Sequence, residues 1–196
     1  SPMGWSKMIY TEPTPNPNAL KFVVNKEVRG NKPPLFYKKD PANNPEADAP
    51  VAYALFKIDG IEDVFFGSDF ITVGKSESIE WETIKDDIIH TIEYHDVGPF
   101  IIEKPQTVET RIGDLESIGE TTDTVKQIVS LLDAKVRPAV AMDGGDIIFH
   151  DFKDGTVYLE MHGACSGCPS STATLKMGIE NMLRHYIPEV HSVEAV

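Results

Sequence analysis

The sequence offers one clear place for chemistry, a single Cys-x-x-Cys motif. Cys165 and Cys168 are the only two cysteines among its 196 residues. Two thiols at this spacing can bind a metal ion or an iron–sulfur cluster, or they can form a reversible disulfide. A secreted scaffold held together by several disulfides is excluded, because it would need more cysteines.

The residues around the two cysteines favour a bound group. Gly163, Ala164, Ser166 and Gly167 are small and leave room beside the backbone. Pro169 is typical of the first position of a helix. The unpaired N–H groups and the positive dipole end of that helix would stabilise thiolates or an anionic cluster. We therefore expect both sulfurs to lie just before a helix.

One chain supplies only half of the usual ligands. A structural zinc ion or a cubane iron–sulfur cluster is usually held by four protein ligands, and this chain has two thiols. A symmetric dimer with facing loops would supply Cys165 and Cys168 twice. The ligand count therefore predicts a homodimer with the site shared between its subunits.

Two other interpretations of the motif stay open at this point. A thioredoxin-like dithiol oxidoreductase also has its dithiol between a strand and a helix start. In that fold, however, much of the domain follows the motif, whereas few residues follow Cys168 here. A zinc ion bound by four thiolates would instead make a structural dimer. The residues favour metal or cluster binding over redox chemistry.

Other side chains near the motif are weaker candidates for ligands. His162 and His150 are each more typical of a surface or packing residue. Asp143 is predicted to be a turn residue, since carboxylates are unusual in thiolate sites. Met177 and Met182 have helical spacing and are predicted to pack in a core. The sequence contains no hydrolase, phosphate-loop or zinc-protease motif.

The composition narrows the class of partners. Hydrophobic residues make up 41% and charged residues 25%, which is ordinary for a globular chain, and the net charge is −13. This acidity argues against nucleic acid or an anionic lipid surface as a partner. There is no apolar run of about 18 residues, so we expect no membrane span.

The first half of the sequence predicts one α+β unit. Residues 1–7 are expected to be the remnant of an expression tag, and the unit itself is expected over 8–98. Pro and Asn indicate a loop over 30–50. Two short β-rich runs around a turn predict a hairpin over 61–73. Apolar residues at helical spacing after Ser78 predict a helix that ends before Gly98.

A linker is expected over 99–120, followed by a second unit over 121–196. Thr121 or Thr122 should cap a first helix. Two strands around a turn come next, then the Cys-x-x-Cys loop, a helix opened by Pro169, and a last short strand. The sequence therefore predicts the α+β class, with two small domains, the second ordered helix, hairpin, Cys-x-x-Cys loop, helix and strand.

Several motifs resemble those of the NifU-like, or Nfu, family. The second unit resembles the NifU C-terminal domain, and the first resembles the Nfu-type domain that precedes it. The residues that carry the resemblance are Thr11–Phe22, Val64–Val73, Val136-Arg137-Pro138, Asp143-Gly144-Gly145-Asp146, Gly163–Ser171 and Leu175–Glu180.

The resemblance implies an iron–sulfur cluster carrier or scaffold, and together with the Cys-x-x-Cys motif it leads us to expect a protein that is not an enzyme. It implies that Cys165 and Cys168 bind a [4Fe-4S] cluster between two subunits. The cluster would come from an upstream assembly scaffold and pass to apo-proteins. Only the resemblance favours iron over zinc and delivery over storage. The sequence shows no signal peptide, so we expect a bacterial cytoplasmic protein, or one of the mitochondrial matrix if a targeting sequence was removed.

Overall fold

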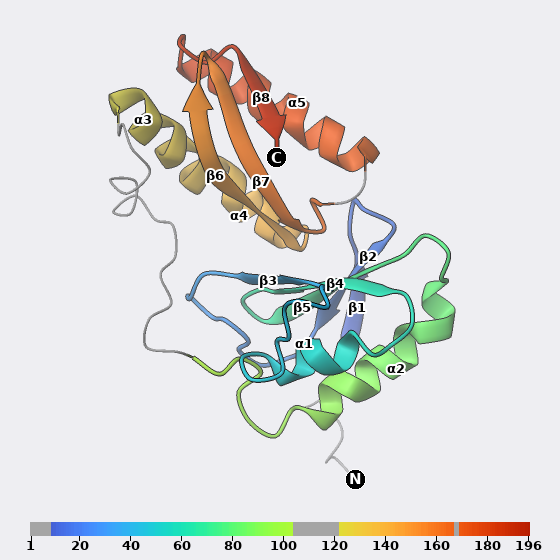
Figure 1. The fold of residues 1–196 in the computed structure, drawn as a ribbon. Coiled ribbons are helices and arrows are strands. Elements are labelled where there is room, and N and C mark those ends of the chain that lie inside the picture. Colours follow the sequence, from blue (N-terminus) through green and yellow to red (C-terminus); the bar gives the residue numbers. More distant parts are fainter. Residues whose placement is uncertain (1–8, 104–121, 167–168) are drawn as a thin grey trace. The chain divides into compact units, whose positions relative to one another are not determined.

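The chain folds into two compact α+β units, as the sequence predicts. A computed structural model describes residues 9–103, 122–166 and 169–196. The boundary between the units falls between Thr107 and Val108. Figure 1 shows the elements of both units, each of which combines one antiparallel or mixed sheet with helices.

The first unit is built on a five-stranded sheet. All neighbouring strands are antiparallel, and their order across the sheet is β1-β2-β5-β4-β3. The predicted hairpin is confirmed as β4 and β5, which pair directly. The strands are β1 (Tyr10–Pro13), β2 (Ala19–Val23), β3 (Leu35–Lys38), β4 (Ile61–Phe66) and β5 (Phe70–Lys75).

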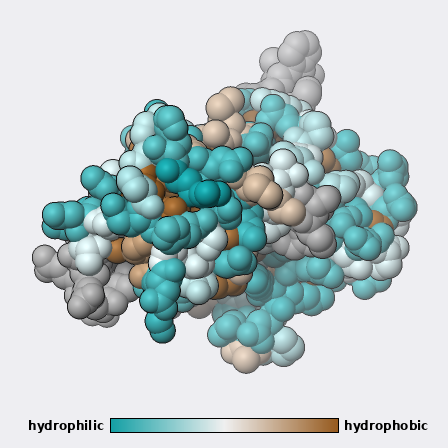
Figure 2. Space-filling model, turned by 90° about the horizontal axis from the view of Figure 1, so that it is seen from above, coloured by the Kyte–Doolittle hydropathy of each residue, from teal (hydrophilic) through white to brown (hydrophobic). Residues whose placement is uncertain are grey.

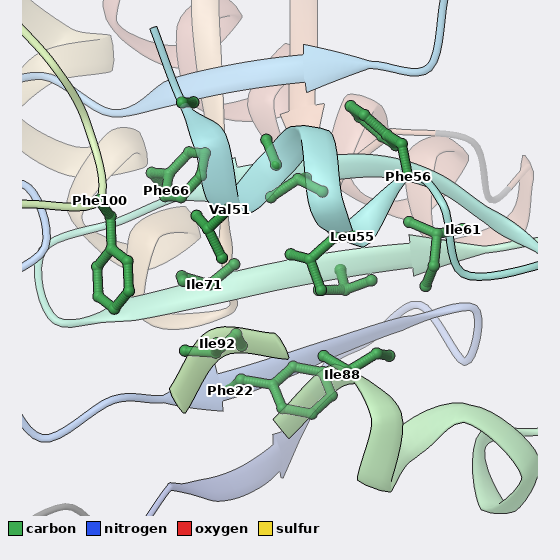
Figure 3. Close-up of a cluster of buried hydrophobic side chains, with 14 of the residues drawn as sticks. Phe22, Val51, Leu55, Phe56, Ile61, Phe66, Ile71, Ile88, Ile92 and Phe100 are labelled. Atoms are coloured by element: carbon green, nitrogen blue, oxygen red, sulfur yellow. The ribbon is translucent and has the colours of Figure 1, made fainter. Parts of the chain in front are cut away.

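Two helices cover one face of this sheet. They are α1 (Pro50–Leu55) and α2 (Trp81–Tyr94), and the latter is the helix predicted from apolar spacing. Every fourth position of α2 is buried, at Ile84, Ile88 and Ile92. Figure 3 shows Val51 and Leu55 of α1 pointing towards β5, where Ile71 lies in the same core cluster.

The first unit differs from the expectation in two places. The strand β3 lies inside the predicted 30–50 loop, where it pairs with β4 at the sheet edge. The predicted 99–120 linker begins later than expected, because Phe100 and Ile101 are buried in the core of the first unit. The remainder of that predicted linker, from 104 onward, lies outside the described residues.

Charged side chains hold this last segment of the first unit in place. Arg29 is buried and donates to the Glu103 carboxylate and, over 2.7 Å, to the carbonyl of Pro33. The Lys26 ammonium pairs with Asp96. These contacts join residues that are about seventy positions apart in the chain. They explain why the first unit reaches past the predicted boundary at 98.

The second unit is a three-stranded sheet with helices on one face. Its strand order is β6-β7-β8, with β6 and β7 antiparallel and β7 and β8 parallel. Figure 1 shows the helices of this unit lying along one face of the sheet, and their apolar side chains form one core cluster with those of the sheet. The elements are α3 (Asp123–Leu131), a π-helical turn (Leu132–Val136), α4 (Arg137–Met142), β6 (Gly145–Lys153), β7 (Thr156–Gly163), α5 (Pro169–Tyr186) and β8 (Ser192–Ala195).

Local signals in the second unit account for its helix starts. The Thr122 hydroxyl accepts a hydrogen bond of 3.1 Å from the Val125 N–H and so caps α3, as predicted. Pro169 opens α5, also as predicted. Alternate residues of β7 are buried, including Val157, Leu159 and Met161, which fixes the strand register.

The exposed surface fits the acidic composition. In Figure 2 hydrophilic side chains cover most of the visible face, and the hydrophobic areas between them are small. Among the described residues, none of the helices combines the length and the apolar character that crossing a bilayer requires.

Candidate functional site

Cys165 lies in the turn that joins β7 to α5. Gly163 ends β7 with a φ of +71°, a left-handed conformation that favours glycine. The N–H of Ser166 then donates to the carbonyl of Gly163 over 3.0 Å, which closes the turn. Cys168 is the second sequence-predicted ligand, and it lies outside the described residues.

The backbone around Cys165 is fixed from two sides. The N–H of Ala164 donates to the carbonyl of Gly144 over 3.1 Å, which ties the turn to the start of β6. On the other side, the hydroxyl of Thr172 in α5 donates to the Cys165 carbonyl over 2.9 Å. The turn is therefore held between β6 and the first turns of α5.

The Cys165 side chain is buried against Gly145. Only 7% of Cys165 is exposed, and its sulfur belongs to the core cluster of the second unit. A Cβ on Gly145 would lie 2.7 Å from this sulfur and 2.7 Å from the carbonyl oxygen of His162. A glycine is therefore required at position 145 for Cys165 to occupy its place.

The electrostatic environment keeps this thiol protonated. Burial, with smaller contributions from the nearby carboxylates of Asp143 and Asp146, raises the pKa of Cys165 from 9.0 to about 12. The sequence predicted that the helix start would stabilise a thiolate at this position. In the structure, the cost of desolvating the charge outweighs that effect, because the sulfur lies inside the core rather than at its surface.

A charged pair lies directly beside the turn. Arg137 donates to both carboxylate oxygens of Asp146, from Nε over 2.9 Å and from Nη2 over 2.8 Å. Asp146 is buried, and these hydrogen bonds raise the pKa of the Arg137 guanidinium. The sequence reasoning treated Arg137 and Asp146 only as parts of a resemblance. Asp146 directly follows the double glycine Gly144-Gly145, and this position is a sequence signal that links it to the turn with Cys165, whereas Arg137 has no such signal.

Of the weaker candidates, Asp143 lies close enough to Cys165 to raise its pKa, whereas the others described below have different surroundings. His162 lies on β7, where its Nε2 is 3.4 Å from a Glu160 carboxylate oxygen. Met182 packs against the core, as predicted. Met177 does not, because it is 59% exposed on α5. Within the described ranges, the structure has no cluster of three or more His, Cys, Asp or Glu residues that could bind a metal ion.

Comparison with known families agrees with this architecture. The model of the NifU-like domain matches residues 128–194, and the model of the N-terminal domain of the scaffold protein Nfu/NifU matches residues 9–97. Each match falls on one of the two units. The chain therefore belongs to the Nfu family.

Curated relatives extend the likeness over nearly the whole chain. A Drosophila persimilis protein named NFU1 iron-sulfur cluster scaffold homolog, mitochondrial, is 44% identical over 193 residues. Its counterpart from Drosophila ananassae is 42% identical over 189 residues. The alignments cover 97% and 96% of this chain, but only 66% and 64% of the relatives' own length.

Among solved structures, one partial match is to a protein from yeast. The solution structure of a NifU-like protein from Saccharomyces cerevisiae is 28% identical, with a TM-score of 0.43. The match covers 50% of this chain and 86% of the yeast chain.

Proposed function

We propose that the protein is an iron–sulfur cluster scaffold that binds a [4Fe-4S] cluster between two subunits. Cys165 and Cys168 of each subunit would supply the four thiolates. The observation that carries this proposal is the single Cys-x-x-Cys, with Cys165 in the turn before α5 of a NifU-like domain. The names of the relatives support the scaffold role.

The dimer follows from the ligand count. A cubane cluster needs four cysteine ligands, and a chain with two cysteines provides half of them. A two-fold axis through the cluster would bring the same loop from both subunits together. Such a shared site comes apart when the subunits separate, which suits a cluster that is handed on. We therefore propose a homodimer that forms on cluster binding.

The cluster is cargo in this account, and the protein is not an enzyme. It would receive the cluster from an upstream assembly scaffold and deliver it to apo-proteins that lack one. Cys165 must lose its proton to become a ligand, and its raised pKa makes this costly without metal. Binding to iron offsets that cost, because metal ligands are thiolates.

We further propose that the protein works in mitochondria. Both Drosophila relatives are named as mitochondrial proteins. The expectation of a bacterial cytoplasmic protein finds no support among them.

Anaerobic reconstitution with iron and sulfide tests the proposed function. The protein should develop a visible chromophore with about four irons per dimer and the Mössbauer spectrum of a [4Fe-4S] cluster. Cys165→Ser and Cys168→Ser should each abolish loading, whereas Ser166→Ala, which changes the same turn without removing a thiol, should load normally.

Three results would contradict the proposal. Full iron loading of the double cysteine variant would show that the ligands lie elsewhere. Zinc without sulfide in protein purified without oxygen would favour a zinc-held structural dimer. Rapid turnover of a model disulfide by metal-free protein, through a disulfide within one chain, would favour a dithiol oxidoreductase.

A further inference from the structure

We propose that Arg137 is a positioning residue for Cys165. Arg137 binds Asp146 and thereby fixes the start of β6, which includes Gly145. The Cys165 sulfur packs directly against Gly145. The inference rests on the proposed function only in taking Cys165 as a cluster ligand. The positioning itself is a property of the metal-free protein.

The contact between Arg137 and Asp146 is a strong one. Both carboxylate oxygens accept from the guanidinium, and one of them also accepts from the Ile147 N–H over 2.9 Å. A third guanidinium nitrogen, Nη1, donates to Asp133 over 3.1 Å. A bidentate pair of this kind fixes the direction as well as the distance between its partners. Lysine could not reproduce this geometry.

The π-helical turn explains why Arg137 faces β6. The N–H of Arg137 bonds to the carbonyl of Leu132, five residues back, instead of four. Pro138 follows, and it has no N–H with which to continue a regular α-helix. The extra residue rotates all later side chains by about 100° relative to an unbroken α-helix. The turn thereby sets the direction of Arg137.

The position of Asp146 is passed on to Cys165 through adjacent backbone. Gly145 precedes Asp146 and pairs with Gly163, the last residue of β7. Gly144 accepts the hydrogen bond that holds the turn with Cys165. A shift of Asp146 would therefore move Gly145, which contacts the sulfur, and Gly144, which holds the backbone of the turn.

The same contact balances charge beside the sulfur. Asp146 is buried close enough to Cys165 to act on it electrostatically. Without Arg137 the buried carboxylate of Asp146 would lose its charged partner, and a buried charge without one strongly destabilises the structure around it. Arg137 therefore serves the site in two ways, by fixing its backbone and by neutralising a neighbouring anion.

The test uses the full chain with Cys168→Ser, so that Cys165 is the only thiol. The metal-free protein is treated with iodoacetamide at a fixed pH, and the rate is compared with that of the unfolded chain. Arg137→Gln should raise the alkylation rate of the folded protein about tenfold. This corresponds to a decrease of about 1.4 kcal/mol in the free energy of local opening around Cys165. Arg137→Lys should raise it similarly, because lysine keeps the charge but not the bidentate geometry.

Two control variants separate positioning from general effects. Lys135→Gln removes a positive charge from the same π-helical turn and should leave the rate unchanged. Val193→Ala removes core packing in β8 and lowers the stability of the unit without touching the Arg137 contact. When the two variants are compared under conditions that give them the same stability, Val193→Ala should raise the alkylation rate of Cys165 much less than Arg137→Gln does.

The proposal is overturned by any of three results. These are an unchanged rate in Arg137→Gln, a rate restored to normal in Arg137→Lys, or an equal increase in Val193→Ala at matched stability. A failure of the wild-type chain to bind a cluster would defeat the proposed function but would leave this result standing. If the cluster does bind, the visible circular dichroism of loaded Arg137→Gln should differ from that of the wild type.

Discussion

The sulfur of Cys165 rests on Gly145, at a distance that leaves no room for a side chain at that position. A Cβ there would come within 2.7 Å of the sulfur and within 3.1 Å of the Cys165 backbone nitrogen. Cys165, the proposed ligand, therefore depends on the lack of a side chain at Gly145, the first residue of β6. This contact makes the double glycine at the start of β6 part of the candidate site as well as of a turn.

Gly145→Ala should therefore displace Cys165. The added methyl group meets backbone as well as sulfur, so the expected loss of stability in the second unit is about 1–3 kcal/mol. Hydrogen exchange of β6 and β7, followed by mass spectrometry, measures the effect together with faster alkylation of Cys165.

Gly178→Ala is the matched control. No atom lies within 4 Å of a Cβ at this position of α5. The change should stabilise the helix by about 0.5–1 kcal/mol, because alanine loses less backbone freedom on folding than glycine. A loss of stability in Gly178→Ala, or none in Gly145→Ala, would contradict the assignment.

The raised pKa of Cys165 predicts a pH-dependent reactivity. Folded metal-free protein should keep this proton up to about pH 12, whereas the unfolded chain loses it near pH 9.0. The stability contributed by the buried thiol is therefore present below pH 9.0 and is lost as the pH rises towards 12. At pH 9, folded Cys168→Ser protein should react with iodoacetamide on the order of a hundredfold more slowly than the same chain in guanidinium. Equal rates would refute the buried placement of the sulfur.

The carboxyl of Asp63 in the first unit should make folding stability fall as the pH rises, which is the opposite of the effect of most carboxylates in folded proteins. This residue of β4 faces Gly74 across the strand pair, and burial raises its pKa to about 7, with Glu62 adding to the effect. The folded state therefore holds a proton between about pH 4 and 7 that the unfolded state has lost. Stability should fall as the pH rises through this window.

Asp63→Asn should remove this dependence. At pH 8 the variant should be more stable than the wild type by about 2–4 kcal/mol, and the difference should disappear below pH 4. Both tryptophans lie in the first 107 residues, so denaturant unfolding followed by their fluorescence reports this unit. Asp59→Asn, at an exposed position of the same unit, should not change the pH profile. A variant no more stable than the wild type at pH 8 would be evidence against the buried carboxyl.

Phe100 tests how far the first unit extends. It is 3% exposed in the core, so Phe100→Ala should destabilise the unit by about 3–5 kcal/mol in the same fluorescence measurement. Ile102, two residues later, is 51% exposed, and Ile102→Ala should cost less than about 0.5 kcal/mol. Similar small losses in both variants would show that the segment is a linker after all.

These residues show which features the sequence could predict. The hairpin β4–β5, the helix α2 and the Thr122 cap have local signals. These are two β-rich runs around a turn, helical spacing of apolar residues, and a capping hydroxyl before an apolar stripe. Phe100 and Ile101 have no such signal, because two apolar residues beside glycine and proline show no period. Their burial depends on contacts with residues far away in the chain.

The candidate site likewise has some features that the sequence could predict and others that depend on packing. The two thiols and their helix could be predicted from residue types and from Pro169 alone. The direction of Arg137 could not, because it depends on a π-helical turn, which has no sequence period of its own. The raised pKa of Cys165 also could not be predicted, since burial of the sulfur is a property of the packed core.

The shared cluster is the central claim, and native mass spectrometry of anaerobically reconstituted protein tests it most directly. The account predicts that iron and sulfide occur only in a species with two chains and one [4Fe-4S] cluster, and that removing the cluster returns single chains. A loaded species with one chain, without an added thiol to complete the coordination, would contradict it.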